Sequence, residues 1–316
     1  MINGIINVYK EQGFTSFDVV AKLRSLTRQK KIGHTGTLDP EATGVLPVCF
    51  GNATKLVDYL TDKTKEYEAT LRLGTETDTQ DIWGNVTRQV NMNKVDITQD
   101  EIINTIMSFV GKQQQIPPMY SAIKINGKKL YELAREGVEV ERAPRDIEIF
   151  GIEIKNVDMA DYEIAIAVDC SKGTYIRTLC YDIGRKLGCG AVMTSLKRTR
   201  SGSFKIQQAY TLGQIEEMLS DIPVFTDEKG RNSRDAQRVK EALETVTMGV
   251  DEVFAGYEAV TVSEDNLKRV QNGNYVNHNY AGDYVRIYDD AGRFLALYSY
   301  NKRDRHYIPH KMFLDS

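Results

Sequence analysis

Hydrophobic and polar residues follow strand and helix periodicities in turn along the first part of the chain. Apolar residues fill Ile5–Tyr9 and Val45–Phe50, which predicts two short buried strands. Tyr67–Gly74 alternates apolar and polar residues with the two-residue period of a strand that is buried on one face. Between the first two strands, Thr15 and Asp18 have the spacing of a capping box, and apolar residues then recur at helical spacing. This part of the chain therefore predicts a mixed domain.

The pattern continues in the same way as far as residue 206. Asn52 is expected to cap a helix, and Thr98 with Glu101 forms another capping box. Gly188 is the expected end of a later helix. The remaining expected elements are two antiparallel strands, a helix and a final strand, at residues 147–154, 162–170, 173–188 and 194–206.

Residues 113–145 interrupt this pattern. They hold a Pro-Pro pair, an Asn-Gly hairpin signal and a short helix that should end at Gly137. Six basic residues lie between Lys124 and Arg145. The segment is a candidate for a projecting, RNA-gripping insertion, and a surface insertion without a partner is the alternative.

The last third of the chain changes character. Residues 211–260 carry 11 acidic and 5 basic residues, and residues 211–250 form an acidic connection with helical patterns. Short strand patterns separated by Asn-Gly and Ala-Gly turns follow. We expect one domain over residues 1–250 and a small β-rich domain over residues 251–316.

Composition and charge narrow the class of protein only slightly. The 316 residues are 41% hydrophobic and 27% charged, with a net charge of −3. No apolar run approaches the roughly 18 residues of a membrane span, and no signal peptide is indicated. The four cysteines have no CxxC spacing, so we expect free thiols and a cytoplasmic protein.

Basic residues gather in three short stretches, although the net charge is negative. These are Leu23–Lys31, Lys124–Lys129 and Leu196–Arg200, with tyrosines interspersed along the chain. Each stretch alone is best interpreted as a solvated surface. Together they favour a polyanionic partner.

Several kinds of chemistry find no support in the sequence. GxxxxGK[ST], GxGxxG and GxSxG motifs are absent, so no nucleotide cofactor or serine hydrolase is indicated. His306 and His310 are four residues apart, but Pro309 disfavours a shared helix, and we expect no metal site. Acid chemistry remains, centred on Asp39. A glycosidase pair with Glu41 is one alternative, and a simple turn-forming or capping role for Asp39 is another.

Six separated stretches then resemble one family. GHTGTLDPEATGVLPVCFGNATK (Gly33–Lys55), KEYEATLRLGTETDTQD (Lys65–Asp81), IPPMYSAIKINGKKLYELAREG, CSKGTYIRTLCYDIG, SLKRTRSG and RVQNGNYV (Arg269–Val276) are similar to motifs of the bacterial TruB family, the tRNA pseudouridine-55 synthases. The resemblance covers most of the chain and thins over residues 215–255.

The resemblance implies roles for individual residues. Asp39 is implied to be the catalytic aspartate, Arg177 its ion-pair partner, and Tyr67 the residue that stacks on the target base and takes part in proton transfer at C5. Further residues are implied to bind the substrate or support the site: His34 in the space left by the extruded base, Tyr175 and Leu196 in the pocket wall, and Lys55 and Lys10. Lys10 departs from the family pattern, because Glu11 follows it where proline is common.

Contacts to the RNA backbone are expected from the basic stretches. The candidate residues are Lys30, Lys31, Lys124, Lys128, Lys129, Arg142, Lys197 and Arg198.

The family's fold and activity set the remaining expectations. They are an α+β chain with a mixed, mostly antiparallel-sheet catalytic domain, an RNA-binding insertion and a PUA-like C-terminal domain. The reaction is isomerisation of uridine in the T-loop of tRNA, on a monomer with no cofactor, guide RNA, protein partner or membrane. Asp39 would stay ionised beside the permanently charged, two-pronged guanidinium of Arg177. Whether Asp39 attacks C1′ or C6 first is left open.

Two alternatives to this function remain. One is a non-catalytic tRNA-binding or tRNA-folding protein. The other is a relative that needs a guide RNA and partner proteins, which the insertion at 113–145 disfavours because the resemblance links it to the stand-alone bacterial form.

Overall fold

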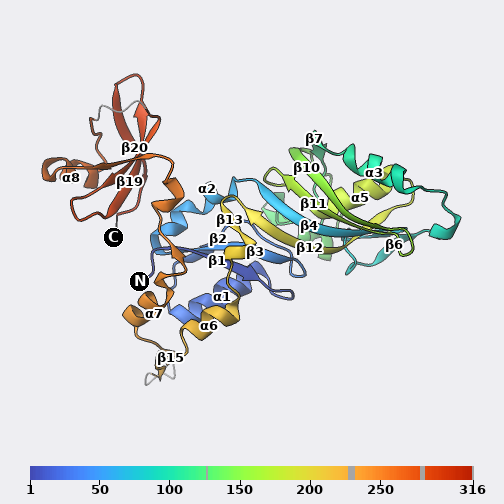
Figure 1. Cartoon of the computed structure of the whole chain (residues 1–316), viewed down its shortest axis with the longest axis horizontal. Helices are drawn as coiled ribbons and strands as arrows, with labels where there is room; N and C mark the ends of the chain where they lie inside the picture. Colours follow the sequence, from blue (N-terminus) through green and yellow to red (C-terminus); the bar gives the residue numbers. More distant parts are fainter. Residues whose placement is uncertain (126, 227–231, 278–281, 315–316) are drawn as a thin grey trace.

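The computed structural model describes residues 1–316 except 126, 227–231, 278–281 and 315–316. Within the described residues, the strands form a ten-stranded sheet, a four-stranded sheet near the C-terminus and three two-stranded ribbons. The large sheet occupies the centre and right of Figure 1, and the C-terminal sheet lies at the left. The protein is therefore elongated, with its two sheets side by side along the long axis.

The large sheet runs in the order β16–β1–β3–β12–β4–β11–β10–β7, with β2 beside β3 and β13 beside β12. Neighbours pair antiparallel except β3 and β12, which are parallel where Lys197 faces Thr43 and Arg198 faces Gly44. The expected mixed, mostly antiparallel α+β fold is thus confirmed. The strands are β1 (Gly4–Lys10), β2 (Ile32–His34), β3 (Thr43–Phe50), β4 (Lys65–Leu73), β7 (Gly111–Gln115), β10 (Arg145–Asp158), β11 (Glu163–Cys170), β12 (Ala191–Ser201), β13 (Phe204–Lys205) and β16 (Thr247–Met248).

Two groups of helices cover two halves of this sheet. Beside β1 and β3, the helices α1 (Ser16–Thr27), α6 (Leu212–Met218) and α7 (Ala236–Glu244) bury apolar side chains in one core. Beside β4, β10, β11 and β12, the helices α3 (Gln99–Met107) and α5 (Ile176–Lys186) form a second core. The parallel junction of β3 and β12 joins the halves, and the candidate catalytic loop precedes β3.

The two faces of β4 differ, as its alternating sequence predicted. Tyr67, Ala69 and Leu71 are buried in the core with α3 and α5. Glu68 and Thr70 point to the other side, where they line an open pocket. Both expected capping boxes are present: Thr15 with Asp18 before α1, and Thr98 with Glu101 before α3.

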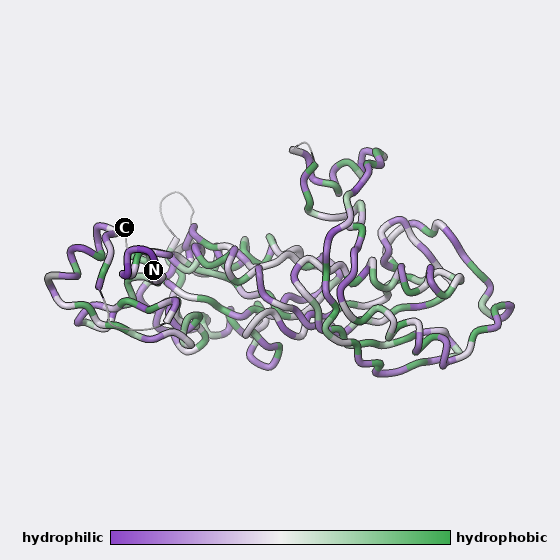
Figure 2. Tube along the Cα trace, turned by 90° about the horizontal axis from the view of Figure 1, so that it is seen from above, coloured by the Kyte–Doolittle hydropathy of each residue, from purple (hydrophilic) through white to green (hydrophobic). Residues whose placement is uncertain are grey.

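The insertion begins later than its sequence suggested. Residues 113–115 belong to β7 and Arg145 begins β10, so the segment between them leaves the sheet. It contains the ribbon β8 (Lys124–Ile125) and β9 (Lys128–Lys129), and then α4 (Leu130–Arg135), which is followed by Gly137 with φ 72°. Asn126 of the expected hairpin turn lies outside the described residues. The insertion is the part that projects at the top of Figure 2.

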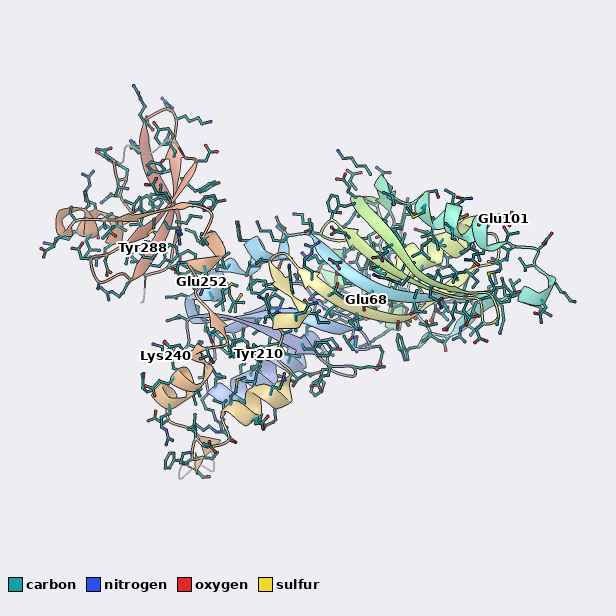
Figure 3. All side chains as sticks on the ribbon, in the orientation of Figure 1. Glu68, Glu101, Tyr210, Lys240, Glu252 and Tyr288 are labelled. Atoms are coloured by element: carbon teal, nitrogen blue, oxygen red, sulfur yellow. The ribbon has the colours of Figure 1, made fainter. Side chains whose placement is uncertain are left out.

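The C-terminal sheet pairs β17 (Glu258–Thr261), β18 (Tyr284–Tyr288), β19 (Phe294–Asn301) and β20 (His306–Met312) in that order. Its own apolar cluster includes Val285, Ile287 and Tyr298. In Figure 3, Tyr288 lies in this sheet and Glu252 in the connection that leads to it. The expected β-rich C-terminal unit is therefore present.

Other elements are short. They are α2 (Val57–Thr61), η1 (Gly51–Leu56), η2 (Met92–Lys94), η3 (Ile206–Gln208), η4 (Glu252–Phe254), α8 (Glu264–Gln271), and the ribbons β5 (Thr75–Thr77) with β6 (Val86–Gln89) and β14 (Phe225–Thr226) with β15 (Asn232–Ser233).

Asn52 does not cap a helix: its amide donates to the carbonyls of Phe313 and Leu314, and no side chain caps η1. His306 and His310 both lie on β20, where each ring packs against a tyrosine.

Hydrophobic stretches stay short along the tube in Figure 2, and none of the described helices is long and apolar enough to cross a membrane.

Candidate active site

The loop that carries Asp39 is held from both sides. Leu38 and Ala42 are buried, and the Leu38 backbone exchanges hydrogen bonds with the Ser16 hydroxyl, which accepts from N–H at 3.0 Å and donates to the carbonyl at 3.3 Å. The carbonyl of Pro40 accepts from the Gly13 N–H at 3.0 Å and from the Lys10 ammonium at 2.8 Å. Asp39 is thus presented by a fixed backbone.

Asp39 forms a two-pronged ion pair with Arg177. Arg177 Nε lies 2.9 Å from Asp39 Oδ2, and Nη2 donates to Oδ1 at 3.4 Å. The Arg177 side chain is buried on α5, whereas that of Asp39 is 40% exposed. The pair expected between these residues is present, and the carboxylate lies at the rim of the core, where solvent reaches it.

Arg177 makes further contacts that the sequence did not reveal. Its Nη1 donates to the carbonyl of Thr79 at 2.9 Å and lies 3.5 Å from Asp81 Oδ2, and its Nη2 donates to the carbonyl of Tyr120 at 2.9 Å. Burial raises the pKa of Asp81. Asp81 ends the Lys65–Asp81 stretch, so its position was visible in the sequence, but its contact with Arg177 depends on the fold.

Tyr67 and Arg198 lie opposite each other on β4 and β12. Burial raises the pKa of Tyr67, so its hydroxyl is protonated at neutral pH, and it hydrogen-bonds the Arg198 side chain. Arg198 is only 1% exposed, and its guanidinium donates to the carbonyls of Val45 at 2.7 Å and Gly36 at 3.0 Å. The prediction that Arg198 contacts RNA is wrong, because its donors hold the catalytic loop and the tyrosine.

The expected pocket residues surround this arrangement. Burial lowers the pKa of His34, which is neutral at pH 7, and its Nδ1 has no hydrogen-bond partner among the described residues. Burial raises the pKa of Tyr175, which precedes α5. Leu196 is buried in the same core cluster as Leu38 and Tyr67.

Lys10 supports the loop and does not face a ligand. It is fully buried, and its ammonium donates to the carbonyls of Glu11, Phe14 and Pro40. Burial lowers its pKa to about 8, an effect that the charge of Asp39 opposes. The expected support of the site therefore acts through the backbone next to Asp39, and direct substrate binding by Lys10 does not fit its burial.

Lys55 has a different environment from the one expected. Its ammonium donates to the carbonyl of Met312 at 2.8 Å, at the end of β20. Together with Asn52, it ties the first domain to the C-terminal strand. This contact does not test the implied role of Lys55 in substrate binding, which stays a prediction.

The remaining basic candidates lie at the surface. Lys30, Lys31, Lys124 and Lys128 are exposed, and Lys128 pairs with Glu136 at 3.2 Å. Five further contacts involve Lys31 and the other candidates: Lys31 with Asn52, Lys129 with the Tyr131 hydroxyl, Arg142 with the Pro117 carbonyl and with Glu139, and Lys197 with Glu68.

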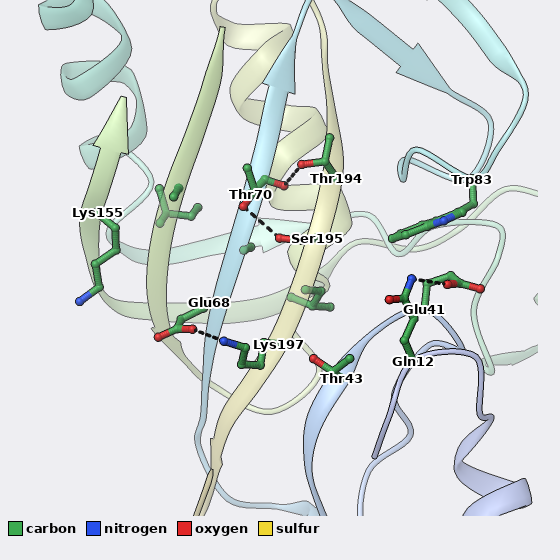
Figure 4. Close-up of a pocket in the computed structure, with 14 residues that line it drawn as sticks. Gln12, Glu41, Thr43, Glu68, Thr70, Trp83, Lys155, Thr194, Ser195 and Lys197 are labelled. Atoms are coloured by element: carbon green, nitrogen blue, oxygen red, sulfur yellow. Dashed lines mark hydrogen bonds and ion pairs between the residues drawn. The ribbon is translucent and has the colours of Figure 1, made fainter. Parts of the chain in front are cut away.

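An open pocket of about 440 Å³ adjoins the catalytic loop. Glu41, two residues after Asp39, lines it together with Leu196, Trp83 and residues on the outer face of β4 and β12. Figure 4 shows the Glu68–Lys197 ion pair and the Gln12–Glu41 hydrogen bond on its walls. A ligand of nucleotide size has access here to carboxylate, hydroxyl, amide and ammonium groups.

The glycosidase alternative does not gain from this geometry. The side chain of Glu41 accepts a hydrogen bond from Gln12 Nε2 at 2.9 Å, whereas Asp39 pairs with Arg177.

The described residues contain no cluster of three His, Cys, Asp or Glu side chains that could hold a metal ion.

Comparison with known families gives matches over most of the chain. A model described as TruB family pseudouridylate synthase (N terminal domain) matches residues 24–176, and one described as tRNA pseudouridylate synthase B C-terminal domain matches residues 177–253. The second match includes much of the acidic connection, where motif resemblance was thin.

Curated proteins and solved structures are also similar to this chain over most of its length. A protein named tRNA pseudouridine synthase B from Lachnoclostridium phytofermentans is 46% identical, over 99% of this chain and 100% of its own. One with the same name from Clostridium perfringens is 45% identical over 96% of each chain. A chain in the crystal structure of a Cbf5–Nop10–Gar1 complex superposes with a TM-score of 0.67 at 26% identity, over 98% of this chain and 85% of that one.

Proposed function

The chain belongs to the TruB family of pseudouridylate synthases, and we propose that Asp39 is the catalytic carboxylate with which it isomerises uridine 55 in the T-loop of tRNA. The observation that carries the assignment of Asp39 is its two-pronged pair with the buried Arg177. No other acid of the resemblance motifs combines an exposed carboxylate with a buried guanidinium in the described residues.

The reaction suits a site built of acids, bases and aromatic rings. The N1–C1′ bond of the target uridine breaks, the base turns, and a C5–C1′ bond forms. The hydrogen on C5 leaves as a proton and N1 gains one, so the reaction is redox-neutral and no group is added. Asp39 is the group that attacks the nucleotide, and Arg177 keeps it ionised and oriented.

Tyr67 and its neighbours then position the extruded base. Removing a base from a stack costs a few kcal/mol, and stacking on an aromatic ring returns about 1–3 kcal/mol. Tyr67 lies opposite Arg198, and it accepts the proton from C5 as its own hydroxyl proton is lost, a loss that the charge of Arg198 favours. Tyr175 and Leu196 complete the wall, and the neutral ring of His34 suits the space from which the base has left.

The substrate is the T-arm stem-loop of tRNA, and the chain acts on it as a monomer without a guide RNA or protein partner. Support for stand-alone action comes from the near-complete match to bacterial relatives named tRNA pseudouridine synthase B. The exposed lysines of the insertion and of residues 30–31 supply phosphate contacts. The four described cysteines are free and buried, which supports a cytoplasmic site of action.

We divide the chain into a catalytic domain at residues 1–250, including the insertion and the acidic helical connection, and a PUA-like domain at 251–316. The separate apolar cluster of β17–β20 supports this boundary.

The direct experiment is incubation of the purified chain with an unmodified T-arm stem-loop, followed by carbodiimide mapping of pseudouridine. We expect a single modified position in the loop. A matched stem-loop with cytidine at that position is the control and should remain unmodified.

Three results would contradict the proposal. Release of free uracil, detected by mass spectrometry, would indicate a glycosidase. Tight binding without pseudouridine would indicate a tRNA-binding or tRNA-folding protein. Activity that appears only after a guide RNA or other proteins are added would indicate a guided enzyme.

A further inference from the structure

Trp83 is the single tryptophan of the chain, and nothing in the mechanism above uses it. Its side chain is 47% exposed on the loop between β5 and β6. Exposing a large aromatic ring to water is unfavourable in free energy. Its apolar faces can instead be covered by a flat partner that stacks on them.

The backbone under this ring is fixed. The N–H of Trp83 donates to Asp81 Oδ1 at 3.3 Å, and the N–H of Ile82 donates to the carbonyl of Met193 on β12 at 2.9 Å. Gly84 follows in a tight turn, where an added Cβ would lie 2.2 Å from Thr79 Oγ1. The exposed ring is therefore held by an ordered loop, which lowers the entropy cost of using it for binding.

The same loop leads directly to the catalytic pair. Asp81, which accepts from the Trp83 N–H, lies 3.5 Å from Arg177, and Arg177 pairs with Asp39. The backbone of Trp83 is thus connected to the reacting carboxylate through three consecutive contacts.

Trp83 also shares the open pocket with hydrogen-bonding groups. Figure 4 shows its ring beside the Gln12–Glu41 pair, and Thr43 and Leu196 line the same pocket. A flat ring next to an amide and a carboxylate is suited to a nucleobase, whose face stacks and whose edge hydrogen-bonds.

We propose that Trp83 is a positioning residue that stacks on a second, unpaired base of the tRNA loop, different from the target uridine. Gln12 and Glu41 meet the edge of that base. This inference rests on the proposed function, since it takes the RNA to be the substrate that reaches Asp39. Stacking at Trp83 anchors the loop while the target base enters the site.

Because Trp83 is the sole tryptophan, its fluorescence reports on this contact without any mutation. Titration of the wild-type chain with an unmodified T-arm stem-loop should quench the emission, with a midpoint at the Kd measured by filter binding. A series of stem-loops with one abasic position at a time should lose the quenching at one loop position other than the target. Emission that is unchanged at saturating RNA, or equal quenching by every abasic stem-loop, would overturn the proposal.

Kinetics provide the second test. Trp83→Ala should raise the KM for the stem-loop by about tenfold, with kcat within about twofold of wild type, because the contact is made equally before and during the reaction. Trp83→Phe should recover most of the loss. Phe225→Ala is the matched control, since Phe225 is 59% exposed on β14, whose partner strand β15 lies far from β4 and β12 in Figure 1, and the KM of this variant should not change.

An unchanged KM in Trp83→Ala would overturn the proposal, as would a Trp83→Phe variant impaired as strongly as the alanine variant. Pseudouridine is measured in the same wild-type samples. If pseudouridine forms while the Trp83 emission is unchanged, only this inference fails. If pseudouridine does not form, the proposed function fails.

Discussion

Asp39 depends on a single guanidinium that is shared with other groups. Arg177 contacts the carboxylates of Asp39 and Asp81 and the carbonyls of Thr79 and Tyr120. Five N–H donors in a rigid plane can serve four partners at once, whereas an ammonium has only three. The exposure of Asp39 and the burial of Arg177 mean that the arginine sets the geometry and the aspartate meets the substrate.

Arg177→Lys should therefore lower kcat by at least about a hundredfold, because an ammonium cannot hold both oxygens of Asp39 and also replace the donors to the Thr79 and Tyr120 carbonyls. The KM for the stem-loop should change much less. Single-turnover pseudouridine formation measures the effect. A kcat within fivefold of wild type would show that a simple positive charge is sufficient.

Lys10 gives the site a pH dependence with a defined sign. Burial lowers its pKa to about 8, so the ammonium is charged at pH 7 and loses a proton as the pH rises through that value. The neutral amine has two donors for the three carbonyls of Glu11, Phe14 and Pro40, and the loop before β3 loosens. We expect kcat to fall several-fold between pH 7 and pH 9. A constant or rising kcat over this range would contradict this role.

At the scale of elements, the parallel junction of β3 and β12 holds the catalytic loop against the rest of the sheet. Arg198 on β12 donates to the carbonyl of Val45 on β3 and to Gly36 in the loop. Gly44 has φ 106°, and an added Cβ would lie 2.2 Å from the Arg198 carbonyl. At this junction β3 and β12 approach so closely that position 44 requires glycine, and the Arg198 side chain reaches the carbonyls of β3 and of the loop.

Arg198→Met should lower the free energy of unfolding by about 3 kcal/mol, because two buried carbonyls lose their donors. Urea unfolding followed by circular dichroism measures this. Lys197→Met is the matched control on the same strand, where a half-exposed pair with Glu68 is lost, and it should change stability by about 0.5 kcal/mol or less. Equal effects of the two changes would contradict the assigned role of Arg198.

At the scale of the whole molecule, a chain of net charge −3 has to bind a polyanion. The acidic residues are concentrated in the connection at 211–260, whereas exposed lysines lie on the insertion and near residue 30. Lys55 and Asn52 bind backbone carbonyls at the C-terminal end of the chain, so the C-terminal sheet is tied to the body. Local basic surfaces, not total charge, should therefore determine the salt dependence of binding.

Lys124→Ala should weaken binding to tRNA and reduce the slope of log Kd against log salt concentration by about one, as expected for one lost phosphate contact. Lys240→Ala on α7, within the acidic connection (Figure 3), is the control and should leave the slope unchanged. Equal slopes for wild type and the Lys124 variant would contradict a contact between Lys124 and an RNA phosphate.

Local features of the fold were predictable from the sequence, and long-range ones were not. Capping boxes at Thr15 and Thr98 and the alternation from Tyr67 onward depend on neighbouring residues, and the structure has them. The strand β20 was not predicted, because Pro309 and charged residues obscure its alternation. Asn52 also has the local pattern of a cap, but a partner 261 positions away takes its amide.

In the candidate site, too, contacts between residues far apart in the sequence could not be predicted from local patterns. The pairing of Asp39 with Arg177 was expected only through family resemblance, since 138 positions separate them. Asp81 was missed because its contact with Arg177 joins residues 96 positions apart, and Trp83 was missed because its place beside the pocket depends on the fold. Arg198 was misassigned because a run of basic residues suggests a surface, whereas strand alternation turns this side chain inward, next to the outward-facing Lys197.

The most direct test of the central claim is Asp39→Asn, which keeps the shape of the side chain and removes its charge and nucleophilicity. Release of tritium from tRNA labelled at C5 of uridine would measure turnover, and filter binding would measure Kd. We predict that turnover falls by at least about a thousandfold, with Kd within about threefold of wild type. Turnover within tenfold of wild type would contradict the account, because another group would then have to carry out the chemistry.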